Sequence, residues 1–110
     1  MEASALAEVK RISRIPRILG RAMRRAKKTT FIFPNNCSFR VVSDCQSAHH
    51  RFLSRFGALY SSSANESGKK FDYNFALSSA GVVVFDAREI CECAPSRIFR
   101  VRKNKLKNLR

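Results

Sequence analysis

Two β-rich runs separated by a short turn signal constrain the fold of this chain most. Residues 29–33 and 37–42 are rich in Thr, Phe, Ile and Val, and Pro34-Asn35-Asn36 between them is typical of a turn. The pattern predicts a hairpin or two neighbouring strands. Helical and extended patterns alternate along the rest of the chain, which favours an α/β or α+β fold with a mixed sheet.

Apolar residues at helical spacing predict three further elements around these strands. Leu6, Val9 and Ile12 indicate a short first helix, which Pro16 should end or restart. A helix is expected over 48–56 with Gly57 as its C-terminal stop, and another over 71–80 with Asp72 favouring its first turn.

Extended structure is predicted for four more segments. Residues 59–62 should lead into a Ser-rich loop, and the fully apolar run 81–85 should form a short central strand. Residues 97–101 and 105–109 are expected to add extended material at the edge of the sheet.

The length and composition favour one folded domain over residues 1–110. A chain of 110 residues is large enough for a single core and too small for two. Its 45% hydrophobic content, with nine Phe, is typical of a globular protein. No apolar run is long enough for a membrane span. Without a secretory signal, a cytoplasmic location is expected.

The positive charge is concentrated at the two ends. Residues 1–30 carry nine Lys/Arg and two Glu (+7), residues 31–96 carry six of each sign, and residues 97–110 carry seven Lys/Arg and no acid (+7). A neutral body with two cationic ends predicts a polyanionic partner, RNA or DNA. The alternative is that these charges only confer solubility or contact ribosomal material nonspecifically.

The segment 17–28 is expected to form a basic amphipathic helix. Ile18, Leu19, Ala22, Met23 and Ala26 share one face of such a helix, and cations occupy the other. The helix could lie on RNA phosphates or on an anionic membrane, or cover a sheet with its apolar side. The residues expected to bind RNA are Arg17, Arg21, Arg24, Arg25 and Lys28 in this helix, with Arg100, Arg102, Lys103 and Lys105 in the basic tail over 97–110.

The cysteines and histidines do not indicate a metal site. The cysteines follow C-x7-C and C-x-C spacing (Cys37, Cys45, Cys91, Cys93), and no His pair stands at zinc-finger distance. We expect reduced, buried or half-buried thiols. His49 and His50 are interpreted as exposed or partly buried helix residues.

The loop over 61–68 is the segment that looks most suited to a ligand. Ser and Asn supply donors and acceptors, small side chains allow close approach, and Gly68 can adopt positive φ. The alternative is an ordinary turn between a strand and a helix.

Four blocks in order resemble the YrdC-like domain, the fold of the threonylcarbamoyl-AMP synthases that act in tRNA modification. Residues 30–34 (T-F-I-F-P) are similar to a T-F-x-F-P strand, and 39–41 (F-R-V) to a V-R-V strand. Residues 63–68 (S-A-N-E-S-G) are similar to an S-A-N-x-S-G loop, and 95–98 (P-S-R-I) to a P-S-T-I element. The resemblance covers about residues 28–101 and implies a mixed twisted sheet with helices.

The resemblance also implies a ligand cleft and RNA binding. Members of that family use ATP, with Mg, together with L-threonine and bicarbonate, and many bind double-stranded RNA or tRNA. Ser63, Asn65 and Ser67 would then be nucleotide-binding, and Arg40, Ser61 and Ser96 threonine-binding. The alternative for Arg40 is a surface strand residue paired with Asp44 or Asp86.

The family's upstream motifs are not visible in this sequence. A P-T-E/D-T-x-x-G segment is not found, and Lys10, Arg11, Arg14 and Pro16 only faintly resemble a K-x-R-P-x-x-K-P motif that holds the triphosphate. Adenylate formation requires several cations or a metal at the phosphates. We therefore expect a shortened relative that lacks part of the N-terminal region, with the catalytic residues unknown.

Three functional hypotheses follow. The first is a YrdC-like RNA-binding domain with a residual nucleotide and threonine cleft, related to tRNA threonylcarbamoyladenosine biosynthesis. The second is an active L-threonylcarbamoyladenylate synthase, a nucleotidyltransferase whose missing elements lie outside this chain. The third is a basic interaction protein of the translation apparatus.

Overall fold

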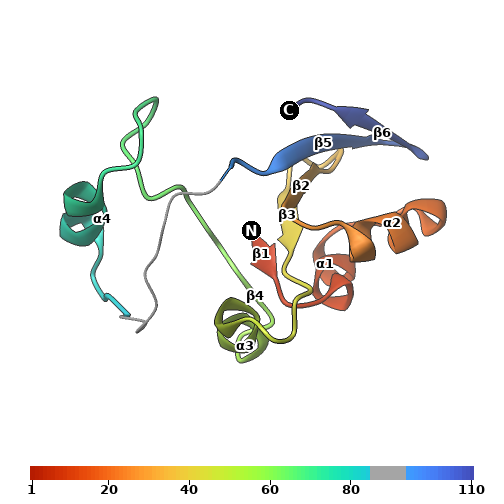
Figure 1. The fold of residues 1–110 in the computed structure, drawn as a ribbon. Helices are drawn as coiled ribbons and strands as arrows, with labels where there is room; N and C mark the ends of the chain where they lie inside the picture. The colour runs from red at the N-terminus through yellow and green to blue at the C-terminus, as the bar shows by residue number, and fades with distance from the viewer. Residues whose placement is uncertain (85–93) are drawn as a thin grey trace. The chain divides into compact units, whose positions relative to one another are not determined.

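The computed structural model describes residues 1–84 and 94–110, which divide into two units (Figure 1). Unit 1 comprises Met1–Ser61 and Pro95–Arg110, and unit 2 comprises Ser62–Ala94 as far as it is described. Unit 1 holds the sheet and unit 2 holds one helix, α4.

The predicted hairpin over 29–42 is confirmed. Strands β2 (Thr29–Ile32) and β3 (Ser38–Val41) pair antiparallel, with Phe31 opposite Phe39. The turn is closed by the Asn36 N–H, which donates to Phe33 O at 2.9 Å, and Asn36 takes a φ of +60°. Asn is one of the few residues besides Gly that tolerates this conformation, so the Pro-Asn-Asn signal has a clear physical basis.

The hairpin forms the two middle strands of a six-stranded mixed sheet, which the alternating pattern predicts. Strand β1 (Glu2–Ala3) pairs parallel with β3 and antiparallel with β4 (Ala58–Leu59). On the other side, β5 (Arg97–Arg102) pairs parallel with β2, and β6 (Lys105–Asn108) pairs antiparallel with β5. The strand order is β4-β1-β3-β2-β5-β6.

Two strand predictions are corrected by the structure. Residues 97–101 do not form edge material, because β5 lies between β2 and β6 inside the sheet. The apolar run 81–85 is not a central strand: residues 81–84 form a bend and a coil in which Val82 is 85% exposed, and Phe85 lies outside the described residues. An apolar run without a partner strand has no ladder to join, and sequence alone does not supply the partner.

The predicted helices appear with shorter bounds. They are α1 (Leu6–Ile12), α3 (Ala48–Ser54) and α4 (Tyr73–Ser79). Helical structure starts again directly after Pro16, as predicted. A single 3₁₀ turn, η1 (Arg17–Leu19), leads into α2 (Gly20–Arg25). Among the described residues, no helix is long and apolar enough to cross a membrane.

The basic amphipathic helix is shorter than predicted, and fewer residues form its buried apolar face. Leu19 and Met23 are buried, whereas Ile18 is 71% exposed. Positions four apart stack on one face, so the pair at 19 and 23 faces the sheet while Ile18 and Ala22 are turned about 100° away. The helix ends at Arg25, and Lys28 lies beyond it with a φ of +46°.

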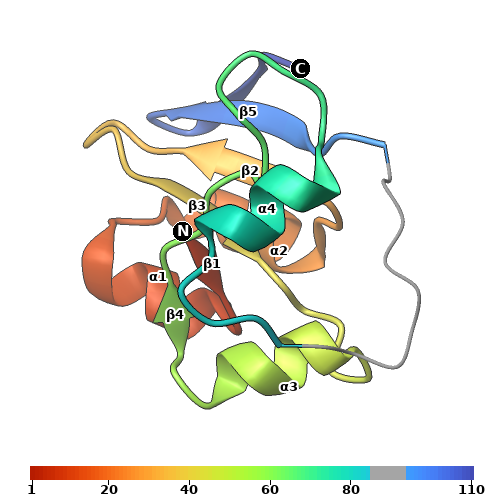
Figure 2. The same cartoon turned by 90° about the vertical axis from the view of Figure 1, so that its left-hand side faces the viewer.

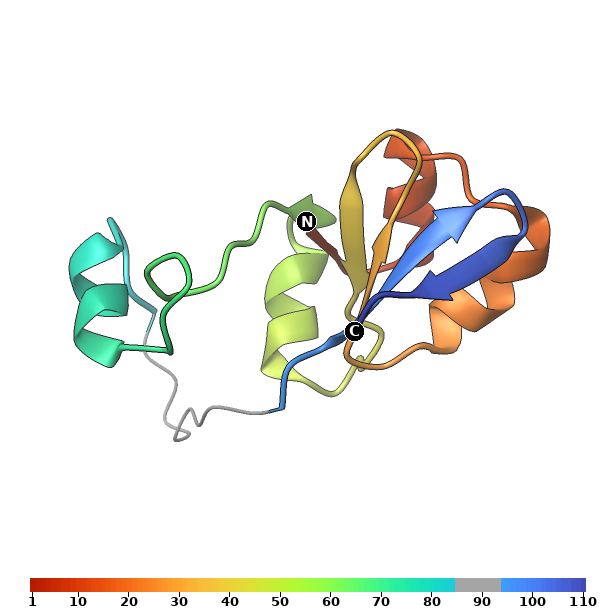
Figure 3. The same cartoon turned by 90° about the horizontal axis from the view of Figure 1, so that it is seen from above.

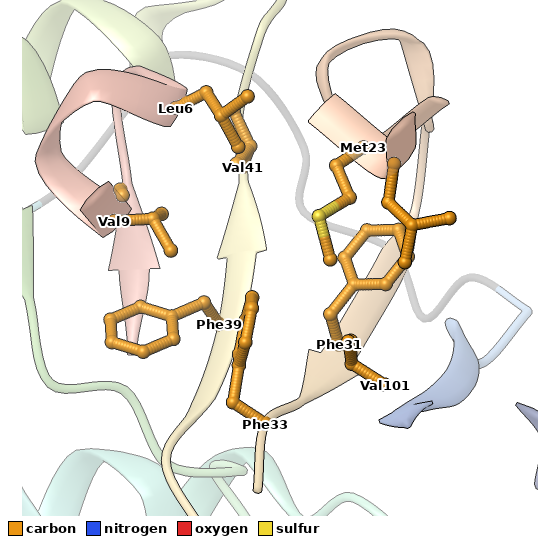
Figure 4. Close-up of a cluster of buried hydrophobic side chains, with 10 residues drawn as sticks. Leu6, Val9, Met23, Phe31, Phe33, Phe39, Val41 and Val101 are labelled. Carbon is orange, nitrogen blue, oxygen red and sulfur yellow. The ribbon is translucent and has the colours of Figure 1, made fainter. Parts of the chain in front are cut away.

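One core holds unit 1 together on a single face of the sheet. Helices α1 and α2 lie on the same side of the strands (Figure 3). Their buried side chains meet Phe and Val residues of β2, β3 and β5 (Figure 4). The core comprises Ala3, Leu6, Val9, Leu19, Met23, Phe31, Phe33, Phe39, Val41 and Val101. Covering a sheet is thus the role of the apolar side of α2.

Local signals at the ends of α3 and α4 behave as the sequence predicts. After α3, Gly57 has a φ of +77° and its N–H donates to Leu53 O at 2.8 Å, which is a glycine-dependent helix stop. At the start of α4, the Asp72 carboxylate accepts from the Phe75 N–H at 2.9 Å. Asp72 therefore favours the first turn through a direct capping bond.

Candidate nucleic-acid interface and ligand residues

The hairpin of β5 and β6 concentrates positive charge through its pairing register. Arg100 stands directly opposite Lys107, and Arg102 directly opposite Lys105. All four side chains are exposed, and because strand residues alternate between faces they lie on the same face of the hairpin. Lys103 follows at the turn with a φ of +48°. Two like-charged pairs side by side are unfavourable unless a negatively charged partner is present.

Lys107 is a member of this surface that was not predicted from the sequence. It lies two residues after Lys105 on β6, so the period of two along a strand places both on one face. That alternation in 105–109 was the available signal.

The basic side of η1 and α2 forms a second cationic surface in the same unit. Arg17, Arg21, Arg24 and Arg25 are exposed, and so is Lys28 after the helix. Within residues 1–84 and 94–110, ion pairs join Glu8 to Arg11, Glu2 to Arg40 and His49, and Glu66 to Lys69. No acid of these described ranges pairs with a predicted RNA-binding residue.

The structure brings the two basic ends of the sequence together at one end of the sheet. A hollow of about 710 Å³ is lined both by the segment 13–17, between α1 and η1, and by the β5–β6 turn. It contains cations from each end of the chain, Arg14 and Arg17 from one and Lys103 from the other. Arg14, Arg17 and Lys103 therefore meet at this hollow. Arg100 and Arg102 alternate with the buried Val101, so they lie on the face of the sheet away from α1 and α2.

Arg40 lies in the middle of the sheet, on the face opposite the core. Its neighbours Phe39 and Val41 are buried against the helices, so its own side chain projects from the other face. The guanidinium Nη1 lies 3.5 Å from Glu2 Oε1, and the other Glu2 oxygen, Oε2, lies 2.9 Å from His49 Nε2. Glu2 is thus the carboxylate partner that the structure gives Arg40.

Among the described residues, Arg40 pairs with Glu2 and not with Asp44, one of the two acids considered from the sequence. The Asp44 Oδ1 instead accepts a hydrogen bond from the Gln46 N–H at 3.2 Å. Asp86 lies outside the described residues. Glu2 reaches Arg40 because β1 inserts beside β3 with Glu2 in register with Arg40. A two-residue strand has no periodicity, so the sequence gives no signal for this pairing.

The other two predicted threonine-binding residues, Ser61 and Ser96, lie on different sides of Arg40. Ser61 is exposed and follows β4, whereas Ser96 is half-buried and precedes β5. These strands are four positions apart in the sheet order, which is roughly 19 Å at the usual spacing between strands. The Ser96 carbonyl accepts from the Arg110 guanidinium, at 3.2 Å from Nη2.

The S-A-N loop belongs to unit 2 and is closed by its own hydrogen bonds. The Asn65 side-chain amide donates to Glu66 O at 3.0 Å and to Lys69 O at 2.9 Å. Gly68 has a φ of +79°, as its position in the loop predicts. Ser63 and Ser67 are exposed and Asn65 is half-buried. The loop stands between β4 and α4, so it is a strand-to-helix turn that presents two hydroxyl groups.

The described cysteines and histidines differ in their exposure. Cys37 is half-buried and Cys45 exposed, which corrects the expectation of burial for Cys45; Cys91 and Cys93 lie outside the described residues. His49 is exposed and His50 half-buried on α3, as predicted, and this helix lies beside β4 (Figure 2). No group of three His, Cys, Asp or Glu that could hold a metal occurs among residues 1–84 and 94–110.

Comparisons with protein-family models, with curated proteins and with solved structures found no match for this chain.

Proposed function

We propose that this chain is a YrdC-like RNA-binding domain that binds double-stranded RNA or tRNA and retains a nucleotide and threonine cleft. The observation that carries the RNA-binding part is the pair of like-charged cross-strand contacts on β5 and β6. Its relation to tRNA threonylcarbamoyladenosine biosynthesis rests on the four sequence blocks over 28–101.

The charge arrangement is costly unless an anion binds to it. Opposed like charges destabilise a strand pair by about 0.2–1 kcal/mol each, and neutral residues at the same positions would avoid that cost. Cations dispersed over the surface would make the protein equally soluble without placing like charges opposite each other. Phosphates of a nucleic-acid backbone would attract both cations of each pair and so offset their mutual repulsion. Each neutralised phosphate would also release condensed counterions, which favours binding further.

The cations of unit 1 stand on a helix and on a two-stranded ribbon. Helix α2 covers one face of the sheet and the ribbon presents its paired cations on the other, so the two cationic surfaces would contact different stretches of phosphate backbone. The residues assigned to this contact are Arg17, Arg21, Arg24, Arg25, Lys28, Arg100, Arg102, Lys103, Lys105 and Lys107.

Binding of a double-stranded RNA and of a tRNA transcript should weaken steeply with salt. A protein with six to ten phosphate contacts loses about 10³–10⁵-fold in affinity between 50 and 200 mM salt. Fluorescence anisotropy over a salt series, with a DNA duplex of the same sequence in parallel, measures both the slope and the preference for RNA. An affinity that is constant across this range would contradict phosphate binding, and equal binding of the DNA duplex would contradict RNA selectivity.

The position of Arg40 favours a second candidate, an active L-threonylcarbamoyladenylate synthase that uses ATP, L-threonine and bicarbonate and needs elements outside this chain. A planar guanidinium suits a carboxylate, and here it is half-buried on the face of the sheet away from the core. In this role Ser63, Asn65 and Ser67 would contact the nucleotide. Ser61 and Ser96 adjoin strands four positions apart, so only one of them would contact a threonine held by Arg40. Glu2 already occupies the guanidinium, so a substrate carboxylate would have to displace it.

The synthase candidate predicts that pyrophosphate release from ATP requires both threonine and bicarbonate. An Arg40→Lys variant keeps the charge and loses the bidentate fork, so it should raise the KM for threonine more than the KM for ATP. A coupled pyrophosphate assay on the folded chain measures this. Release that continues without threonine, or none with all three substrates present, would contradict independent synthase activity.

A further inference from the structure

The hollow at the end of the sheet is formed by three segments that are distant in sequence. They are residues 13–17, the β2–β3 turn at 33–35 and the β5–β6 turn at 101–104. Its volume of about 710 Å³ lies within the range of small-molecule sites, about 300–1,000 Å³. None of the residues of the S-A-N loop and none of the predicted threonine-binding residues is among its lining residues, whereas Arg14 and Pro16, which faintly resemble the triphosphate motif, are.

One wall of this hollow is apolar and rigid. Pro16 and Pro34 face it, and their rings fix the backbone φ near −65°. Behind them, Phe33 and Val101 are part of the buried core and hold the wall in place. Ile15 adds an aliphatic surface. Such a wall suits a flat, largely apolar body such as a nucleobase.

The rim of the hollow is cationic. Arg14, Arg17 and Lys103 line it together with the amides of Asn35 and Asn104, and no Asp or Glu of the part of the chain that the structure describes is among the lining residues. Guanidinium groups bind phosphate through paired hydrogen bonds, and a lysine ammonium adds a point charge. The rim therefore suits a phosphate group, and the apolar wall beside it suits the base of a nucleotide.

Specific bonds hold the walls in place. The Asn35 Nδ2 donates to Ser13 Oγ at 3.0 Å, which ties the β2–β3 turn to the segment before η1. Its Oδ1 accepts from the Cys37 N–H at 3.1 Å. Lys103 is held in the left-handed region, which is costly for a residue with a side chain. The site is thus preformed, which reduces the entropy lost on binding.

We propose that this hollow is a separate site for one nucleotide, with the phosphate on Arg14, Arg17 and Lys103 and the base against Pro16 and Pro34. The nucleotide is either a free mononucleotide or the terminal nucleotide of an RNA strand, because both present the same phosphate and base. No residue of the S-A-N loop lines this hollow, and the proposal stands whether or not the chain binds long RNA.

Three probes test the recognition of phosphate and base together: AMP, adenosine and inorganic phosphate. AMP should bind at least about tenfold more tightly than either of the others, since only AMP uses both the wall and the rim. Backbone NMR shifts on titration with AMP should map to residues 13–17 and 101–104. Equal affinity for AMP and adenosine, or shifts confined to residues 63–68, would overturn the proposal.

A double variant provides the matched test. Arg14→Gln with Lys103→Gln removes two rim charges from exposed positions and should weaken AMP binding at least about tenfold. Arg51→Gln with Arg55→Gln removes the same charge from exposed positions of α3 and its C-cap and should leave AMP binding unchanged. Equal loss in both variants would reduce the effect to net charge and overturn the site.

Oligonucleotides distinguish the two sources of the nucleotide. A short single-stranded RNA with a 5′ phosphate should bind more tightly than the same RNA with a 5′ hydroxyl if the site holds an RNA end. If AMP binds and the 5′ phosphate has no effect, the ligand is a free mononucleotide. Salt-dependent RNA binding without AMP binding would overturn this site and leave the proposed function standing.

Discussion

Replacing Phe39 by Ala should destabilise unit 1 by about 3–5 kcal/mol. Phe39 is 1% exposed, and its ring packs edge-on against Phe33 with the centroids 5.7 Å apart. The substitution leaves a cavity at the centre of the sheet, between α1 and the hairpin. Because small domains are stable by about 5–15 kcal/mol in total, this loss should leave a measurable unfolded fraction. Urea unfolding followed by far-UV circular dichroism measures the change.

Two controls separate the cavity from the loss of an aromatic ring. Phe39→Leu retains most of the volume and should cost about 1–2 kcal/mol. Phe52→Ala makes the same chemical change at a position that is 48% exposed on α3, and it should cost less than about 1 kcal/mol. If the Phe39 and Phe52 variants lost equal stability, the core would not lie where the structure places it.

Local sequence signals predict most of the elements in this fold. The β2–β3 hairpin follows from β-rich runs around Pro34-Asn35-Asn36, and its turn uses Asn36 at positive φ. The ends of α3 and α4 follow from Gly57 and Asp72, each of which makes the expected backbone bond. These features depend on residues within four positions of one another, so a short sequence window contains all the necessary information.

Features that depend on distant pairing were not predictable in the same way. The strand β1 is two residues long, and only its position between β3 and β4 makes it a strand. The sequence predicts residues 97–101 as extended material at the edge of the sheet. In the fold, β5 is paired on both sides while Arg100 and Arg102 remain exposed on one face. Pairing and exposure of side chains are separate properties of a strand.

The candidate site shows the same division between local and distant information. The basic residues of both ends were predicted individually, and their exposure is confirmed. What the sequence did not indicate is that Arg102 and Lys105 stand opposite each other, or that Glu2 lies between Arg40 and His49. These contacts are decided by register, where a shift of one residue would move each side chain to the other face.

Neutralising the four paired cations of the hairpin should weaken RNA binding and leave the fold at least as stable. The variant carries Gln in place of Arg100, Arg102, Lys105 and Lys107, which form two opposed pairs. If each contacts one phosphate, the salt slope should fall by about 3.6 and the affinity at 0.15 M salt by about 10³-fold. Removal of two like-charged pairs should raise the free energy of unfolding by about 0.4–2 kcal/mol, or leave it unchanged. Anisotropy and urea unfolding on the same preparation measure the two effects.

A variant with the same loss of charge at other positions distinguishes direct contact from the general field of a cationic protein. Gln at Arg51, Arg55, Lys69 and Lys70 removes four exposed cations that lie outside the hairpin. Its salt slope should stay close to that of the parent chain, because the slope counts phosphates contacted and not net charge. Equal slopes in the two variants would contradict contact by the hairpin. A lower free energy of unfolding in the hairpin variant would show instead that the four replaced cations stabilise the fold.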